Sequence, residues 1–172
     1  MIADSSVLIL FARINRLELL QQLYGIVKVP KPVYDECTAS KHGDAALIRD
    51  AFSRNMLNIA VLSSDAKGLS EGLKRAHPQL GDAEAAVIAL AIVTKSGALI
   101  DEHPARMAAK LQGVKCTGSL GVLIAAYSKG ILSENQVKIL FQALVRENIR
   151  VGGAVVAEFL DTLHGIRKDK TF

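Results

Sequence analysis

Acidic side chains occur where the predicted strands and helices of this 172-residue chain begin or end. Asp4 follows the apolar run MIA, and Asp101 follows ALI. Asp82 and Glu84 open the stretch LGDAEAAVIALA at residues 80–91, and Glu36 lies in VYDEC. Carboxylates that share a cleft repel each other unless a cation lies between them. Oxygen ligands suit Mg²⁺ or Mn²⁺, and one or two such ions can activate water for phosphodiester hydrolysis.

Each of these acids also has an ordinary structural explanation. Asp4, Asp82 and Asp101 all stand at positions where a side chain can cap the following helix. Glu84 in a first helical turn complements the helix dipole, and Glu36 belongs to a residue type that is mostly solvated. What favours a functional site is their combination, because acids at two strand ends and one helix start all adjoin apolar segments.

The elements that must hold these acids alternate between short β-type runs and helical patterns. Strands are predicted at residues 1–4, 26–30, 58–62, 98–101 and 114–118. Helices are predicted at residues 5–23, 31–38, 82–96, 103–112, 118–128, 133–147 and 152–163. The alternation predicts a three-layer α/β/α fold around a mostly parallel sheet of about five strands. Ligands of such sheets bind beyond the carboxyl ends of the strands, where two of the acids stand.

The length of the chain predicts one domain over residues 1–172, with a core over about 1–130 and a helical extension over about 131–165. Ser133 followed by Gln136 predicts a capping box at the start of one helix of this extension. The apolar spacing of residues 133–147 and 152–163 predicts core packing. Apolar side chains left exposed there are expected to serve a homodimer or another protein partner.

The composition describes a folded protein, because 50% of the residues are hydrophobic and 22% are charged. The formal net charge of +4 is compatible with a polyanionic partner. Two cysteines without a CxxC pair predict a reducing, cytoplasmic compartment. The sequence predicts neither a signal peptide nor a membrane span, since it has no apolar run of about 18 residues.

Three stretches resemble the PIN-domain family, especially its VapC-related subgroup of toxin-like ribonucleases. The opening ADSSVLILF is similar to the motif D-[ST]-[SP]-x-L-I, and GDAEAAVIALA resembles G-[ED]-x-E-A-x-x-x-A-x-A. The segment from ALIDE to TGSLG resembles the family's finish of an acid-bearing strand, short helix, short strand and turn. The similarity extends over most of residues 1–163, and only three residues precede Asp4, so the first strand must be very short.

The resemblance implies a Mg²⁺- or Mn²⁺-dependent endoribonuclease that uses one or two ions. Carried over by motif, the catalytic acids are Asp4, Glu36, Glu84 and Asp101, with the hydroxyl of Ser6 supporting the first. Asp4, Glu84 and Asp101 are the expected metal ligands. Asp82 is expected to cap the helix and either to act as an outer acid or to share the metal with them. The implied partners are an RNA substrate, a second copy of the chain and, for relatives that are toxins, an antitoxin protein.

Basic side chains near the cleft are expected to hold the RNA backbone, and the candidates are Arg13, Arg16 and Arg106. The alternative for each is an ordinary solvated arginine. The alternative for the whole protein is a catalytically inactive PIN-like scaffold that binds RNA or a protein. A broken acid set would indicate such a scaffold, whereas all four positions carry acids here.

Overall fold

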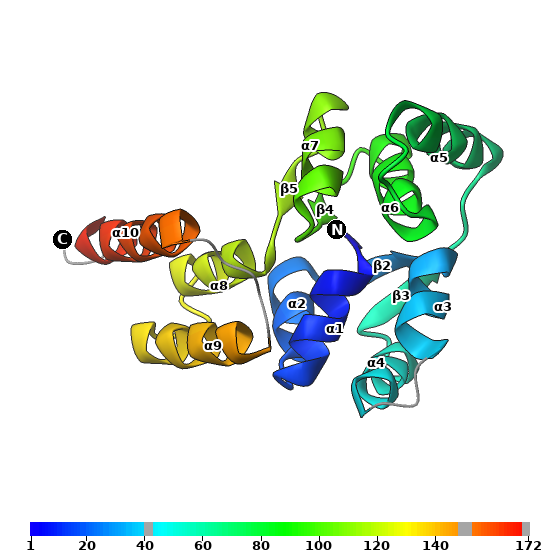
Figure 1. Cartoon of the computed structure of the whole chain (residues 1–172). Helices are drawn as coiled ribbons and strands as arrows, with labels where there is room; N and C mark the ends of the chain where they lie inside the picture. Colours follow the sequence, from blue (N-terminus) through cyan, green and yellow to red (C-terminus); the bar gives the residue numbers. More distant parts are fainter. Residues whose placement is uncertain (40–42, 148–152, 170–172) are drawn as a thin grey trace. The chain divides into compact units, whose positions relative to one another are not determined.

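A computed structural model of the chain describes residues 1–39, 43–147 and 153–169. The chain divides into two compact units, Met1–Ser119 and Leu120–Phe172. Each unit is described by itself, and Figure 1 shows the elements of both. The expectation of a single domain with a core ending near residue 130 stays a prediction.

The first unit is built on a five-stranded sheet in which every strand pair is parallel. The strand order is β3-β2-β1-β4-β5. Strands β2 and β3 are added on one side of the central β1, and β4 and β5 are then added on its other side. Strand order therefore reverses between β1 and β4, and a ligand crevice is expected at this point. The strands are β1 (Ile2–Ala3), β2 (Val27–Pro30), β3 (Leu57–Ala60), β4 (Ala98–Leu99) and β5 (Cys116–Thr117).

Helices flank the sheet and complete the three-layer α/β/α arrangement that the sequence predicted (Figure 1). The predicted helix 5–23 is wrong as one element, because Asn15 adopts a left-handed conformation with φ 53° and separates two helices. Two helices also lie within residues 43–76, where the sequence predicted none. The helices of this unit are α1 (Ser5–Arg13), α2 (Leu17–Tyr24), α3 (Lys31–Ala39), α4 (Gly43–Ser53), α5 (Ser64–Ala76), α6 (Asp82–Val93) and α7 (His103–Leu111).

Helix α6 is buried almost all round, which explains the composition of AAVIALA. Every residue from Ala83 to Ala91 except Glu84 is buried. The helix lies against β1, β2 and β4 and is flanked by α5 and α7. A helix that is apolar on all sides is stable only inside a protein, and alanines permit close approach of its neighbours. This packing fixes the N-terminal end of α6 relative to the sheet.

The second unit is helical, as the sequence predicted. It contains α8 (Ser119–Ser128), α9 (Glu134–Arg146) and α10 (Gly153–Asp169), of which α8 begins at the last residue of the first unit. The predicted capping box is confirmed, because Ser133 N donates to Gln136 Oε1 at 2.8 Å and Gln136 N donates to Ser133 Oγ at 3.3 Å. Phe141 and Phe159 stack between α9 and α10 with ring centroids 4.8 Å apart.

Candidate functional site

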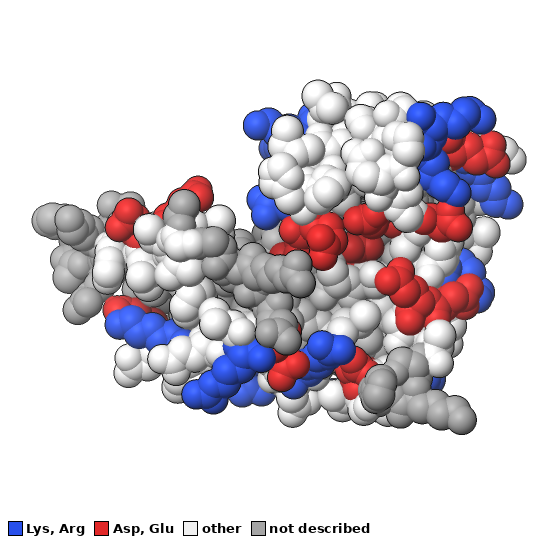
Figure 2. All heavy atoms as spheres, viewed as in Figure 1, with Lys and Arg blue, Asp and Glu red and all other residues white. Residues whose placement is uncertain are grey.

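An open cleft of about 490 Å³ lies at the carboxyl end of the sheet, where strand order reverses. Its lining contains carboxylates from four separate parts of the chain and no lysine or arginine among the described residues. Figure 2 shows Asp and Glu side chains gathered across the middle of this face, with Lys and Arg mostly toward its edges. The acids that line the cleft are Asp4, Glu36, Asp82, Glu84 and Glu102.

Asp4 occupies the centre of the sheet edge. It directly follows β1, and its backbone N donates to Leu99 O of β4 at 3.0 Å. Only 1% of the residue is exposed. Ser6 Oγ donates to Asp4 Oδ2 at 2.9 Å, as expected for a supporting hydroxyl, whereas Asp4 Oδ1 is buried without a hydrogen-bond partner among the described residues. Asp4 is the N-cap residue of α1, but its side chain makes no cap hydrogen bond, so capping does not account for the choice of an acid here.

The surroundings of Asp4 raise its pKa from 3.8 to about 6. Burial is the largest cause, because it disfavours the charged carboxylate. Hydrogen bonds from the Ser6 side chain and the Ser5 backbone lower the pKa, and the negative charges of Glu84 and Glu36 raise it further. An unpaired buried oxygen and a raised pKa both indicate a carboxylate that lacks a positive partner in the part of the chain that the structure describes.

The raised pKa of Asp4 predicts a pH-dependent stability for the metal-free protein. A pKa of about 6 against 3.8 means that the native state binds more protons than the unfolded state between these values, so stability falls as pH rises through about 6. The full shift corresponds to about 3 kcal/mol. Urea unfolding in EDTA from about pH 3 to about pH 7 should show this loss for the wild type relative to Asp4→Asn. A pH-independent difference between the two proteins would contradict it.

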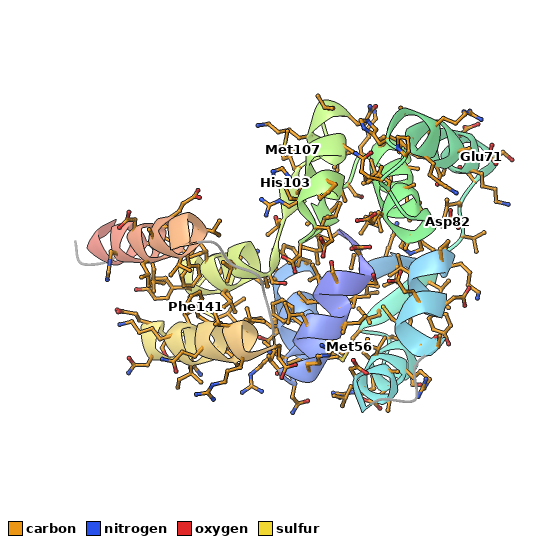
Figure 3. All side chains as sticks on the ribbon, viewed as in Figure 1. Met56, Glu71, Asp82, His103, Met107 and Phe141 are labelled. Atoms are coloured by element: carbon orange, nitrogen blue, oxygen red, sulfur yellow. The ribbon has the colours of Figure 1, made fainter. Side chains whose placement is uncertain are left out.

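The two acids at the start of α6 have different partners from those expected. The prediction that Asp82 is the N-cap is wrong, because Gly81 occupies that position and Asp82 is the first helical residue. Glu84 closes the cap instead, since its Oε2 accepts the backbone N–H of Gly81 at 2.8 Å. The Asp82 carboxylate pairs with Lys74 of α5, and its side chain is 75% exposed. Figure 3 shows Asp82 at the beginning of α6.

Glu36 reaches the same cleft from α3. The helix begins immediately after β2, so its side chains start at the carboxyl end of the sheet. The neighbouring Cys37 is buried, and burial together with the charges of Glu36, Asp4 and Asp44 raises its thiol pKa to about 12. Cys37 is therefore a neutral packing residue and not a nucleophile.

The connection from β4 to α7 presents Glu102, and not Asp101, to the cleft. Asp101 is absent from the described lining residues, and its Oδ1 accepts the backbone N–H of Ser119 at 2.7 Å. Ser119 Oγ donates to the other carboxylate oxygen. Glu102 is the N-cap residue of α7, but its side chain makes no cap hydrogen bond. Glu102 was not among the predicted site residues, and its only signal in the sequence was the adjacent acid pair in ALIDE.

Gly118 permits this arrangement, because a Cβ there would lie 2.8 Å from Asp101 Oδ1 and 3.1 Å from Arg106 Nη1. We expect Gly118→Ala to displace the Asp101 carboxylate from Ser119 and to lower stability by about 1–3 kcal/mol. Urea unfolding checks this. Gly72→Ala in α5 is the control, since a Cβ there meets nothing within 4 Å. Alanine also favours a helix more than glycine does, so this substitution should not lower stability. Equal effects of the two substitutions would contradict the contact.

The predicted RNA-binding arginines do not line the cleft among the described residues. Arg13 pairs with Asp44 of α4 at 3.1 Å. Arg16 is the N-cap residue of α2, and its Nη1 donates to Asn15 O at 2.8 Å. Arg106 is exposed on α7 and lies near Gly118. His103, at the start of the same helix, lies on the side of α7 away from α6 (Figure 3).

The chemistry of the cleft suits a hard divalent cation, although the side chains are not gathered around one point. In residues 1–39, 43–147 and 153–169, no group of three or more His, Cys, Asp or Glu side chains is placed to hold a metal ion. The side-chain donors that line it are carboxylate and serine hydroxyl oxygens, and oxygen ligands are the kind that Mg²⁺ and Mn²⁺ prefer. The unpaired Asp4 Oδ1 is an atom that such a cation would satisfy.

Comparison with known proteins agrees with this architecture. The chain matches the model of a family of PIN domains over residues 1–164, which covers both the sheet and the cleft. No curated protein matches the chain. The matched family, the parallel sheet and the acidic edge all lead to one assignment. The chain belongs to the PIN-domain family.

Proposed function

We propose that this protein is a Mg²⁺- or Mn²⁺-dependent endoribonuclease that acts at the acidic cleft. PIN domains are generally nucleases, and this chain keeps acids at each motif position of the family. The observation that carries the proposal is Asp4, a buried carboxylate in a cleft lined by four other carboxylates. One of its oxygens has no hydrogen-bond partner among the described residues. Such a group is stabilised by a cation and by little else that the cleft offers.

The residues of the chain take separate roles in this proposal. Asp4, Glu36 and Glu84 hold the cation, and Ser6 orients the Asp4 carboxylate through its hydrogen bond. A bound cation supplies charge neutralisation at the scissile phosphate and lowers the pKa of water for attack. Asp82 lies at the rim, where its carboxylate also pairs with Lys74.

The RNA backbone is proposed to reach the cleft past exposed basic side chains. Arg106 is the best placed of the three candidates, because it lies on α7, the helix that begins at the cleft-lining Glu102. Arg13 stands at the far end of α1 from Asp4, about 14 Å along the helix axis at 1.5 Å per residue. Arg13 and Arg16 are therefore proposed to contact RNA only outside the scissile region.

The proposed partners are an RNA substrate, a second copy of the chain and an antitoxin protein, in a cytoplasmic setting. Exposed apolar side chains on α9 and α10 support protein association, since Ile139 is 64% and Val155 is 47% exposed. Among the described residues, no helix is both long and apolar enough to cross a membrane. Light scattering of the purified protein tests the dimer, and co-purification with the product of a neighbouring small gene tests the antitoxin.

Incubation of single-stranded RNA with the wild type in Mg²⁺, Mn²⁺ or EDTA tests the activity. We expect cleavage with either cation and none in EDTA. Attack by water does not need the ribose 2′-hydroxyl, so an RNA with a single 2′-deoxy substitution at the cleaved position should still be cut. Complete protection by that substitution would show attack by the 2′-hydroxyl and would contradict the proposed chemistry.

The scaffold alternative gives a different result in the same assay. If the protein binds RNA equally well in Mg²⁺ and in EDTA and does not cleave it, the result favours an RNA-binding module over a nuclease. Calorimetric titration with Mn²⁺ separates the two further. A nuclease with this cleft binds Mn²⁺ in the absence of RNA, whereas a scaffold has no requirement for the cation.

A further inference from the structure

We propose that Asp101 is a positioning residue. It binds Ser119 and thereby holds Glu102 in the lining of the cleft, where Glu102 adds a carboxylate from a fourth part of the chain. The inference rests on the proposed cation-dependent function. It differs from the role that family resemblance implies for Asp101, which is that of a metal ligand. Three observations carry it: the partners of Asp101, the close packing around them, and the position of the Glu102 side chain in the lining of the cleft.

The Asp101 carboxylate is already bound on both oxygens. Oδ1 accepts the backbone N–H of Ser119, and Oδ2 accepts the Ser119 hydroxyl. The N–H at the first residue of α8 has no partner within the helix, so the carboxylate satisfies it. Ser119 is fully buried, which makes these bonds costly to exchange for others. Because both of its oxygens already accept hydrogen bonds from Ser119, the Asp101 carboxylate is not available as a cation ligand without breaking them.

The packing around Asp101 leaves it little freedom to turn toward the cleft. The backbone of Gly118 approaches so closely that an added Cβ would lie 2.8 Å from Oδ1. Ile100, the preceding residue, is fully buried, and its backbone N donates to Thr117 O at 3.1 Å. The β4–α7 connection is therefore tied to the segment 117–119 through both Ile100 and Asp101.

Glu102 has the complementary properties. It lines the cleft together with Asp4 and Glu84, and its side chain makes no hydrogen bond to the helix that it begins. Its backbone is fixed, because Arg106 N donates to Glu102 O at 3.0 Å and the adjacent Asp101 is bound to Ser119. Asp101 thus anchors the backbone, and the adjacent Glu102 presents its side chain to the cleft.

Isosteric variants distinguish anchoring from cation binding. In Asp101→Asn, the amide oxygen still accepts the Ser119 N–H and the amide nitrogen can donate to the hydroxyl, while the negative charge is lost. Titration calorimetry with Mn²⁺ should therefore give an affinity within about threefold of the wild type for Asp101→Asn. Glu102→Gln should weaken Mn²⁺ binding by at least about tenfold without lowering the melting temperature, and Asp101→Ala should weaken it by about tenfold through loss of the anchor.

The outcomes separate this inference from the proposed function. A loss of Mn²⁺ affinity in Asp101→Asn as large as that in Glu102→Gln would make Asp101 a ligand and overturn the inference. Absence of Mn²⁺ binding by the wild type would overturn the proposed function alone. In that case, hydrogen exchange of the Ile100 and Arg106 amides, which donate to Thr117 O and Glu102 O, tests the anchor. Exchange at least about tenfold faster in Asp101→Ala than in Asp101→Asn would support it, and equal rates would overturn it.

Discussion

Asp4→Asn is expected to reduce RNA cleavage by at least about 100-fold while the protein remains folded, since a direct ligand should cost more than an outer-shell partner. The substitution keeps the shape of the side chain and an acceptor for the Ser6 hydroxyl, but it removes the charge at the centre of the cleft. Cleavage rates under saturating Mn²⁺, with circular dichroism to verify folding, measure the effect. Calorimetry should show a parallel loss of Mn²⁺ affinity.

Stability should change in the opposite direction from activity. At pH 7 without metal, the wild type carries the cost of ionising a buried carboxylate whose pKa is raised to about 6, and the asparagine variant does not. The variant is therefore expected to melt at a higher temperature in EDTA, and the difference should shrink when Mn²⁺ stabilises the wild type. This combination separates a functional acid from one that holds the fold together.

Asp35→Asn is the matched control for this prediction. Asp35 lies on α3 beside Glu36, pairs with Lys31 and is exposed, and it is not among the described residues that line the cleft. Its variant removes an equal charge from the helix that carries Glu36 and should keep cleavage within about threefold, because exposed ion pairs contribute little. Equal losses in the two variants would show a general charge effect and not a site at Asp4.

Much of the fold was predictable because its strands are short apolar runs that alternate with helical patterns. The position of Asp4 followed from the same pattern, since an acid directly after the central strand must stand at the carboxyl edge. Helices α4 and α5 were not predicted. In α5, Gly68 and Gly72 are unfavourable in a helix, and its start depends on a cap from Ser63, whose Oγ accepts the Ala66 N–H at 3.3 Å.

The choice between Asp101 and Glu102 depends on strand register, which the sequence does not reveal. Ile2 pairs with Ala98 and Ala3 with Leu99, so Asp4 is level with Ile100. Side chains alternate between the faces of an extended chain, and paired residues of neighbouring strands point to the same face. Residue 102 then falls on the side of Asp4, and residue 101 falls on the opposite side. Spacing alone permits either acid, and only the pairing of β1 with β4 distinguishes them.

The cap of α6 was mispredicted for a related reason. Asp82 has the side chain of a good N-cap, but the helix begins one residue earlier than that assignment requires. Gly81 takes the cap position, and Glu84, three residues later, accepts its N–H in the geometry of a capping box. The error concerns one residue of register at a helix end, where side-chain type is a weak guide. Its consequence is that Glu84 combines a structural and a proposed catalytic role.

Glu84→Gln is expected to separate these two roles. Glutamine at the same position can still accept the Gly81 N–H, so α6 should begin at the same residue and the melting temperature should change little. The lost charge should reduce cleavage by at least about 100-fold and weaken Mn²⁺ binding, because Glu84 lines the cleft and its charge acts on Asp4.

Asp82→Asn provides the comparison from two residues away. It breaks only a partly exposed pair with Lys74, and we expect cleavage within about threefold of the wild type. Cleavage rates, Mn²⁺ titration and melting curves of both variants measure the contrast. A greater loss of Mn²⁺ affinity in Asp82→Asn than in Glu84→Gln would assign the cation to the rim of the cleft and exclude Glu84 as its principal ligand.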